Sequence, residues 1–154
     1  MSPLGILLCV GSAPVLVGTT YLFVLTLFSA RPRVPGRPAD STRFVVVIPA
    51  HNEELGVAGT VESVLRADYP SERRRVLVVA DNCSDATAER AEQAGARVLV
   101  RHDAERRGKG YALAAAFEQV LQDPDVDAVV VVDADTEVTP NLLSAFGARF
   151  EHRV

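Results

Sequence analysis

The chain begins with a long stretch in which no position carries a formal charge. From Pro3 to Ala30, 28 consecutive residues contain no Asp, Glu, Lys, Arg or His. Leu, Val, Phe and Ile would lie on every face of a helix formed here, which is typical of a helix surrounded by lipid. About 20 apolar residues are enough to cross the hydrocarbon core of a bilayer. We therefore predict a transmembrane helix over residues 1–30.

A cleavable secretory signal and a buried core helix both fit this stretch less well. A signal would open with basic residues and would have a shorter apolar core of about 7 to 15 residues. A core helix with no polar stripe would need a larger protein around it than the rest of this chain supplies.

A basic and proline-rich segment over residues 31–43 sets the expected orientation. It contains Arg31, Arg33, Arg37 and Arg43, whereas no basic residue precedes the apolar stretch. Basic residues collect on the cytoplasmic side of a membrane span and attract anionic lipid. We therefore expect a linker near the lipid headgroups, in a single-pass protein of the cell membrane whose soluble part is cytoplasmic.

The remaining residues, 44–154, alternate between short apolar runs and stretches with helical spacing. The runs cover residues 44–48, 76–79, 98–100 and 128–132 and are apolar at every position, which favours strands buried on both faces. Helical spacing of apolar residues follows each of the first three runs, and Thr139 with Pro140 can open a fourth helix through Phe146. The alternation predicts an α/β fold with a Rossmann-like parallel sheet covered by helices.

Polar segments follow each predicted strand directly. They are residues 51–54, 81–85, 101–110 and 133–135. Open parallel sheets bind ligands at the carboxyl ends of their strands. We therefore expect these four segments to form one ligand-binding edge.

Two aspartates at this edge have the spacing of a cation site. Asp133 and Asp135 stand two residues apart at the end of an apolar strand, so both side chains can point the same way. Mg²⁺ or Mn²⁺ held by one or two carboxylates completes its coordination with substrate phosphates. The pattern Asp-x-Asp also occurs twice within residues 123–127, but only this pair is predicted at a strand's carboxyl end. The alternative is an acidic turn that merely ends the strand.

Positive charge accompanies the acidic pair. Lys109 is the only lysine of the chain and lies between two glycines, and we predict that it contacts phosphate. Arg101, Arg106 and Arg107 bring further charge to the same edge, although a solvated basic loop accounts for each of them as well. Neither GxxxxGK[ST] nor GxGxxG after a strand is present, which argues against P-loop, kinase and NAD-dehydrogenase functions.

For three more polar residues, two roles stay open. Asp81 can accept a hydrogen bond from a nucleotide base or ribose, or can form a turn. Asn52 and Glu53 can contact a nucleoside or cap the next helix. His51 and His102 have no nucleophile partner in the sequence, so we interpret both as loop residues.

Charge and cysteine content narrow the function classes. The formal net charge is −4 and the isoelectric point about 5.4, which argue against a dedicated nucleic-acid binder. Cys9 falls in the predicted span and Cys83 far beyond it, so no disulfide is expected.

The motifs VVVIPAHNEE, VVADNCSDAT, RRGKGYAL and VVVDADTEV, in this order over residues 44–138, resemble a family 2 glycosyltransferase of the GT-A fold. The resemblance implies transfer of a sugar from a nucleotide donor, commonly a UDP-sugar, with a divalent metal bridging the diphosphate. By match, the nucleoside pocket would be lined by Pro49, Ala50, Asn52 and Glu53, with Asp81 facing the base. Lys109 would lie near the donor phosphates, Asp133 near the nucleotide and Asp135 at the metal. With its attached membrane helix, the chain resembles those family members that build polysaccharide or modify lipid-linked acceptors.

The family's second half, with the acceptor site and a carboxylate general base, has no counterpart in this sequence. Only 19 residues follow Asp135, and neither Glu137 nor Glu151 lies in a motif that matches the family's general base. We therefore expect a partial GT-A domain that binds the donor and is inactive by itself, with an unknown acceptor. The alternative function is a nucleotide-binding or assembly module without turnover. A sugar-nucleotide nucleotidyltransferase is less favoured, because PAHNEE stands where a glycine-rich loop would follow the first strand.

Overall fold

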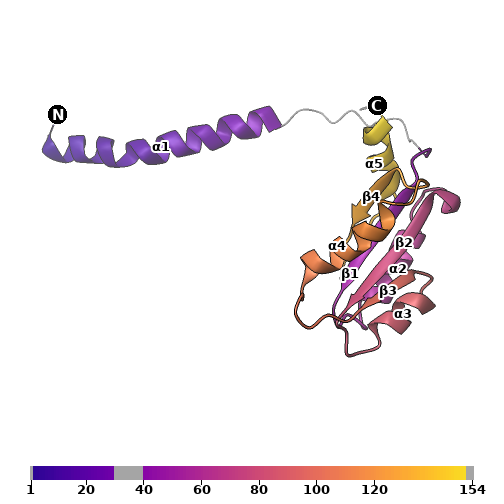
Figure 1. Ribbon diagram of the computed structural model, residues 1–154. Helices are drawn as coiled ribbons and strands as arrows, with labels where there is room; N and C mark the ends of the chain where they lie inside the picture. The colour runs from indigo at the N-terminus through magenta and orange to yellow at the C-terminus, as the bar shows by residue number, and fades with distance from the viewer. Residues whose placement is uncertain (1, 30–39, 152–154) are drawn as a thin grey trace. The chain divides into compact units, whose positions relative to one another are not determined.

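The computed structural model describes residues 2–29 and 40–151, and these divide between two compact units, residues 1–35 and 36–154. Most of the predicted linker, residues 31–39, lies outside the described residues. The first unit is the helix α1 (Pro3–Ser29), which runs through Pro14 (Figure 1). Its segment Gly11–Ser29 is long and apolar enough to cross a membrane by length and composition alone.

Two hydroxyl groups of α1 find their partners inside the helix. Thr19 Oγ1 donates to the carbonyl of Val15 and Thr26 Oγ1 to that of Leu22, both at 2.8 Å. A hydroxyl bonded within its own helix leaves no donor unmet in an apolar solvent. These threonines are therefore compatible with a lipid environment.

The second unit contains a four-stranded sheet in which every neighbouring pair is parallel, in the order β3-β2-β1-β4. The strands are β1 (Phe44–Ala50), β2 (Arg74–Asp81), β3 (Arg97–Arg101) and β4 (Ala128–Val131). The helical elements are α2 (Val57–Leu65), the 3₁₀ turn η1 (Ser71–Arg73), α3 (Thr87–Gln93), α4 (Lys109–Val120) and α5 (Leu142–Glu151). The predicted α/β fold is confirmed.

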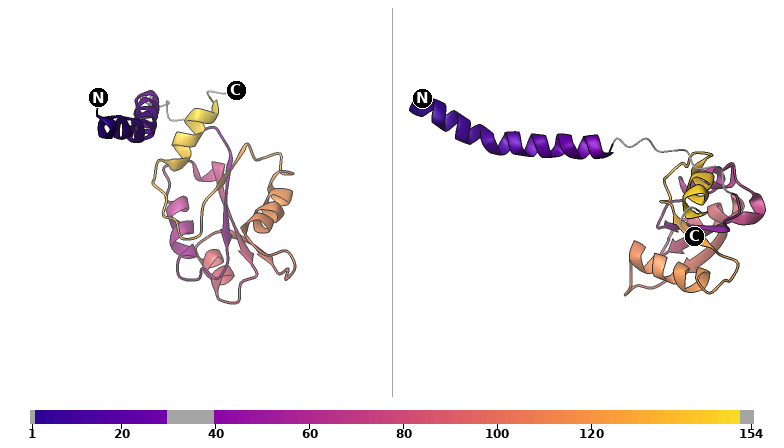
Figure 2. Two further views of the ribbon diagram at one scale, coloured as in Figure 1. Left: turned by 90° about the vertical axis from the view of Figure 1, so that its left-hand side faces the viewer. Right: turned by 90° about the horizontal axis from the view of Figure 1, so that it is seen from above.

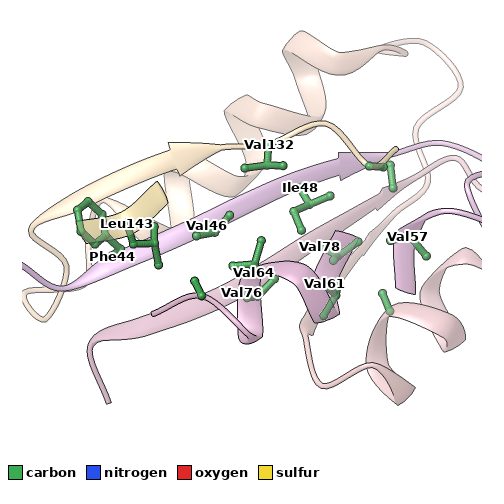
Figure 3. Packing of buried hydrophobic residues seen from close by; sticks show 14 of the residues in the cluster. Phe44, Val46, Ile48, Val57, Val61, Val64, Val76, Val78, Val132 and Leu143 are labelled. Atoms are coloured by element: carbon green, nitrogen blue, oxygen red, sulfur yellow. The ribbon is translucent and has the colours of Figure 1, made fainter. Parts of the chain in front are cut away.

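Alternate residues of the central strand β1 build two cores. Val46 and Ile48 are fully buried against α2, α3 and α5, in the cluster shown in Figure 3. Val45 and Val47 face the opposite side and pack on α4. Helices therefore cover both faces of the sheet (Figure 2). Each fully buried valine or isoleucine side chain contributes roughly 1.5–3 kcal/mol.

The prediction that all four strands are buried on both faces is wrong for the two outer strands. Val100 of β3 is 52% exposed and Val131 of β4 is 41% exposed. Both strands lie at the edges of the sheet, where only one neighbour covers them within the described residues.

The last helix also differs from its prediction. It begins at Leu142 rather than at Thr139, whose hydroxyl donates to Asn141 Oδ1 at 2.9 Å. Among its apolar residues, Leu143 is fully buried, whereas Phe146 and Phe150 are each 42% exposed. Leu143 differs because it packs into the cluster on β1.

At the amino ends of the strands, Arg43 fastens β1 to the turn before β4. Its backbone N–H donates to Asp127 Oδ2 at 2.8 Å, and its guanidinium contacts both Asp127 and Asp125. These hydrogen bonds from Arg43 lower the pKa of Asp127 to about 2. The sheet is thus cross-linked at the end opposite the predicted ligand edge.

Candidate functional site

A cavity of about 470 Å³ opens at the carboxyl ends of β1 and β2. The loop after β1, the end of β2 and the start of α4 supply its lining: Pro49, Ala50, His51, Glu53, Asp81, Asn82, Arg107, Gly108, Lys109 and Ala112. Three of the four polar segments expected at the ligand edge therefore either line this cavity or border it directly.

Asp81 is the last residue of β2 and is 4% exposed. Its Oδ1 accepts hydrogen bonds from Arg101 Nη1 at 2.6 Å and from Asn82 Nδ2 at 3.1 Å. Its Oδ2 accepts a long hydrogen bond from the backbone N–H of Gly108, at 3.4 Å. Gly108 has a φ of +109°, a conformation that favours glycine. The carboxylate is therefore fixed at the floor of the cavity by three neighbouring groups.

Arg101 was expected to add positive charge to the ligand edge, but in the structure it pairs with two carboxylates. Its second guanidinium nitrogen, Nη2, donates to Asp103 Oδ2 at 2.8 Å, and the group lies 6.0 Å from the ring centre of Tyr111. Because the side chain is only 15% exposed and paired with two carboxylates, it is not directed to a ligand.

His51 occupies the rim of the cavity directly after β1. Its Nδ1 lies 2.7 Å from the backbone carbonyl of Asp81, so this nitrogen carries the hydrogen and donates. The backbone N–H of Glu53 donates to Thr87 Oγ1 at 2.8 Å. These contacts fix the loop after β1 to the end of β2 and the start of α3.

Two asparagines with positive φ connect the loops to one another. Asn52 Oδ1 accepts from the backbone N–H of Ser84, and Asn82 Oδ1 accepts from that of Asp103, both at 2.8 Å. Asn52 was expected to line the nucleoside pocket, but its side chain turns to the neighbouring loop and is not among the cavity-lining residues.

Lys109 joins this cavity to the acidic segment after β4. It is the first residue of α4, and its ammonium group contacts Asp133 Oδ1. Both side chains are more than half exposed, at 54% and 59%. Lys109 also lines a second hollow of about 370 Å³, whose wall includes residues 130–133 and Thr136. The lysine therefore stands on the border of two adjacent spaces.

Helix α2 holds the backbone of the acidic segment. Thr60 Oγ1 donates to the carbonyl of Ala134 at 2.7 Å, and Ser63 Oγ accepts from the N–H of Val138 at 3.1 Å. A side chain on Gly56 would place its Cβ 3.3 Å from the same Ala134 oxygen, which is tighter than ordinary contact. The segment carrying Asp133 and Asp135 is thus packed directly on α2.

The two carboxylates suit a hard divalent cation that is also bound by oxygen atoms of a substrate. Asp133 and Asp135 are both exposed. Asp133 lines the hollow of about 370 Å³ that Lys109 also lines, and Asp135 stands two residues further along the chain. Among the residues the structure describes, no group of three or more His, Cys, Asp or Glu side chains converges on one point. Two carboxylates with phosphate oxygens are the usual environment of Mg²⁺ or Mn²⁺ at nucleotides, whereas a metal held by protein alone needs more ligands.

The structure thus brings most of the expected residues together. One cavity is lined by five of them: Pro49, Ala50, Glu53, Asp81 and Lys109. Asp133 forms an ion pair with Lys109, whereas Asn52 and Asp135 are not among the lining residues. His51 also lines the cavity, although the sequence led us to interpret it only as a loop residue because it has no nucleophile partner. Its position immediately after a predicted strand was the signal that could have identified it as a site residue.

Comparison with known proteins identifies the family. Residues 45–153 match the family described as Glycosyl transferase family 2. The probable glycosyltransferase YdaM of Bacillus subtilis is 30% identical over 107 residues, which cover 66% of this chain and 24% of YdaM. The chain therefore spans about a quarter of the length of that relative.

Two solved structures share the fold. A mannosyltransferase of Pyrobaculum calidifontis in complex with GDP-Man and Mn²⁺ superposes with a TM-score of 0.71 and 22% identity, over 92% of this chain and 42% of that one. TarS 1–349 of S. aureus, in complex with UDP-GlcNAc, superposes with a TM-score of 0.61 and 23% identity, over 72% of this chain and 32% of that one. With its ordered motifs, its parallel sheet and a family match over most of its length, the chain belongs to glycosyltransferase family 2 and has the α/β fold of GT-A enzymes.

Proposed function

We propose that this chain forms the donor site of an enzyme that transfers a sugar from a UDP-sugar to a polysaccharide or lipid-linked acceptor. The observation that carries the proposal is the cavity that is lined both by Asp81 at the end of β2 and by Lys109 at the start of α4. The buried hydrogen-bond acceptor suits a nucleotide base, and the cation suits a diphosphate.

In this proposal, different residues contact different parts of the donor. Pro49, Ala50 and Glu53 line the nucleoside part, and Asp81 accepts from the base. Lys109 contacts the phosphates, and Asp133 and Asp135 hold Mg²⁺ or Mn²⁺. The metal would neutralise the diphosphate as it leaves the sugar. Asn52 acts through the loop after β2, because its side chain bonds Ser84.

The proposal places acceptor recognition and the general base outside these residues. Support comes from the greater length of the relatives, since the chain spans 24% of YdaM and 42% of the mannosyltransferase. We further propose that α1 anchors the enzyme in the cell membrane with its soluble part on the cytoplasmic side. The uncharged helix and the four arginines that follow it support this orientation.

The donor site is tested by calorimetric titration of UDP with Mn²⁺ into the full chain in detergent micelles. We expect binding that requires the metal and that disappears in Asp135→Ala. Asp125→Ala is the matched control, since it removes an aspartate from another Asp-x-Asp pair at the opposite end of the sheet. Unchanged binding by Asp135→Ala would contradict the metal assignment. Binding of UDP-sugars in a longer enzyme that never releases or transfers sugar would favour the non-catalytic module instead.

A further inference from the structure

We propose that Arg101 is a positioning residue that occupies one oxygen of Asp81 and leaves the other for the donor base, so that the site selects a base with a single ring N–H donor. The inference rests on the proposed function, because it concerns the same donor site. It identifies uracil, rather than guanine, as the base that this chain recognises.

The first support is the rigidity of Arg101. One guanidinium nitrogen bonds Asp81 Oδ1 at 2.6 Å, and another bonds Asp103 Oδ2 at 2.8 Å. The planar group is therefore fixed by a carboxylate on each side, with the ring of Tyr111 6.0 Å away. Asp103 is itself anchored, because its Oδ1 accepts from the backbone N–H groups of Glu105 and Arg106 at 3.0 and 2.9 Å. A side chain held in this way has little freedom to swing toward a phosphate.

The second support is the unequal use of the two oxygens of Asp81. Oδ1 accepts two hydrogen bonds, from Arg101 and from Asn82. Within the described residues, the only donor given to Oδ2 is the distant N–H of Gly108, at 3.4 Å. A carboxylate oxygen has two acceptor sites, so Oδ1 is filled and Oδ2 retains capacity. One acceptor atom of Asp81 is thus available to a ligand in the cavity.

The bases differ in what they need from such a group. Uracil offers one ring N–H between two carbonyls, and a single oxygen accepts from it. Guanine offers a ring N–H and an amino group side by side, and these pair well only with both oxygens of a carboxylate. With Oδ1 filled by Arg101, guanine would leave one donor unpaired beside Asp81, which is only 4% exposed.

Arg101 also supplies the counter-charge of Asp81. The Asp81 side chain is 6% exposed, and a buried carboxylate needs a charged partner to offset the loss of its hydration. The remaining charged or titratable groups around it are Asp103 beside Arg101, His51 at its backbone carbonyl, and the cavity-lining Glu53, Arg107 and Lys109. Of these, Arg107 and Lys109 are exposed, so Arg101 is the cation in direct contact with the buried carboxylate.

The test compares UDP and GDP binding, each with Mn²⁺, to the full chain in detergent micelles. The variants are Arg101→Met, Arg101→Lys and the control Arg97→Met, which makes the same change at the exposed amino end of β3. We expect the unmodified chain to bind UDP about tenfold more tightly than GDP. Arg101→Met should lose at least tenfold in UDP affinity and should lose the preference for UDP over GDP, because both oxygens of Asp81 then have acceptor capacity. Arg101→Lys keeps a cation beside Asp81 and should retain the preference for UDP, and Arg97→Met should match the unmodified chain.

The outcomes separate the inference from the proposed function. If the unmodified chain binds neither nucleotide, the proposed function and this inference both fail. If it binds UDP, and Arg101→Met keeps both the UDP affinity and the preference for UDP over GDP of the unmodified chain, the inference fails while the proposed function stands. Should Arg101→Met not fold, the ratio of UDP affinity to GDP affinity in the unmodified chain and in Arg101→Lys decides, and a preference for GDP in the unmodified chain overturns the inference.

Discussion

The carboxyl ends of β2 and β4 each carry an aspartate, but the two are placed in opposite ways. Asp81 is 4% exposed and is held by an arginine, an asparagine and a backbone N–H. The side chain of Asp133 is 59% exposed and contacts only one flexible lysine among the contacts found in the described residues. β2 has a strand on each side, whereas β4 is an edge strand.

The contrast shows which part of the site is fixed by the protein's own contacts. On the β2 side the loops are joined by hydrogen bonds between residues 51–54, 81–87 and 101–108. On the β4 side the backbone is held by α2, but the carboxylates still face solvent. We infer that the base is received by a preorganised pocket and that the diphosphate and metal complete the other half.

The largest difference is expected between Asp81→Ala and Asp133→Ala. Removing Asp81 deprives the partly buried Arg101 of a partner and should lower the free energy of unfolding by about 3 kcal/mol. Removing Asp133 breaks an exposed pair and should change it by at most about 1 kcal/mol. Urea denaturation of the full chain in micelles measures both. Equal losses would contradict the contrast between the two ends.

A smaller effect is expected where α2 supports the acidic segment. Thr60→Val removes the hydroxyl that donates to the carbonyl of Ala134 and leaves that buried group unpaired, at a cost of about 1–3 kcal/mol. Because the segment also carries Asp133 and Asp135, metal-dependent UDP binding should weaken as well. Thr60→Ser keeps the hydroxyl and serves as the control. If the valine variant bound UDP and Mn²⁺ as the serine variant does, the support from α2 would be irrelevant to the site.

The smallest effect concerns the amino end of β4, where Arg43 holds Asp127. The pKa of Asp127 is lowered to about 2, so its contribution to stability is complete above the unfolded value near 4. That contribution is lost as the pH falls from about 4 toward 2. In Asp127→Asn the melting temperature should therefore depend less on pH across this window. A thermal melt series in steps of half a pH unit would show it, and an unchanged slope would refute the assignment to Asp127.

The fold was accessible from the sequence because continuous β-branched runs mark buried strands, and the interior of β1 and β2 is such a run. What the pattern could not show was where pairing continues past the apolar residues. Arg74 and Asp81 belong to β2 because β1 and β3 hydrogen-bond to them, which is information from other segments. For the same reason the exposure of Val131 depends on a neighbour that its own sequence does not specify.

The location of the candidate site was predictable from the sequence, but the roles of its individual residues were less so. Asp81 and Lys109 come together because carboxyl ends of parallel strands share one edge. The place of Arg101 was not visible, because a basic residue after a strand is equally typical of a ligand contact and of a partner for a nearby carboxylate. Asn52 shows the same limit, since its bond to Ser84 joins two loops that only the folded sheet brings together.

The position of Lys109 between the two cavities has a consequence for how strongly metal and nucleotide affect each other's binding. A cation at Asp133 would have to displace the ammonium, and an anion in the larger hollow would draw the same ammonium toward itself. Each event removes an obstacle to the other, so the two equilibria are thermodynamically linked. The factor by which Mn²⁺ tightens nucleotide must then equal the factor by which nucleotide tightens Mn²⁺, and exchanging Lys109 for methionine would reduce both together.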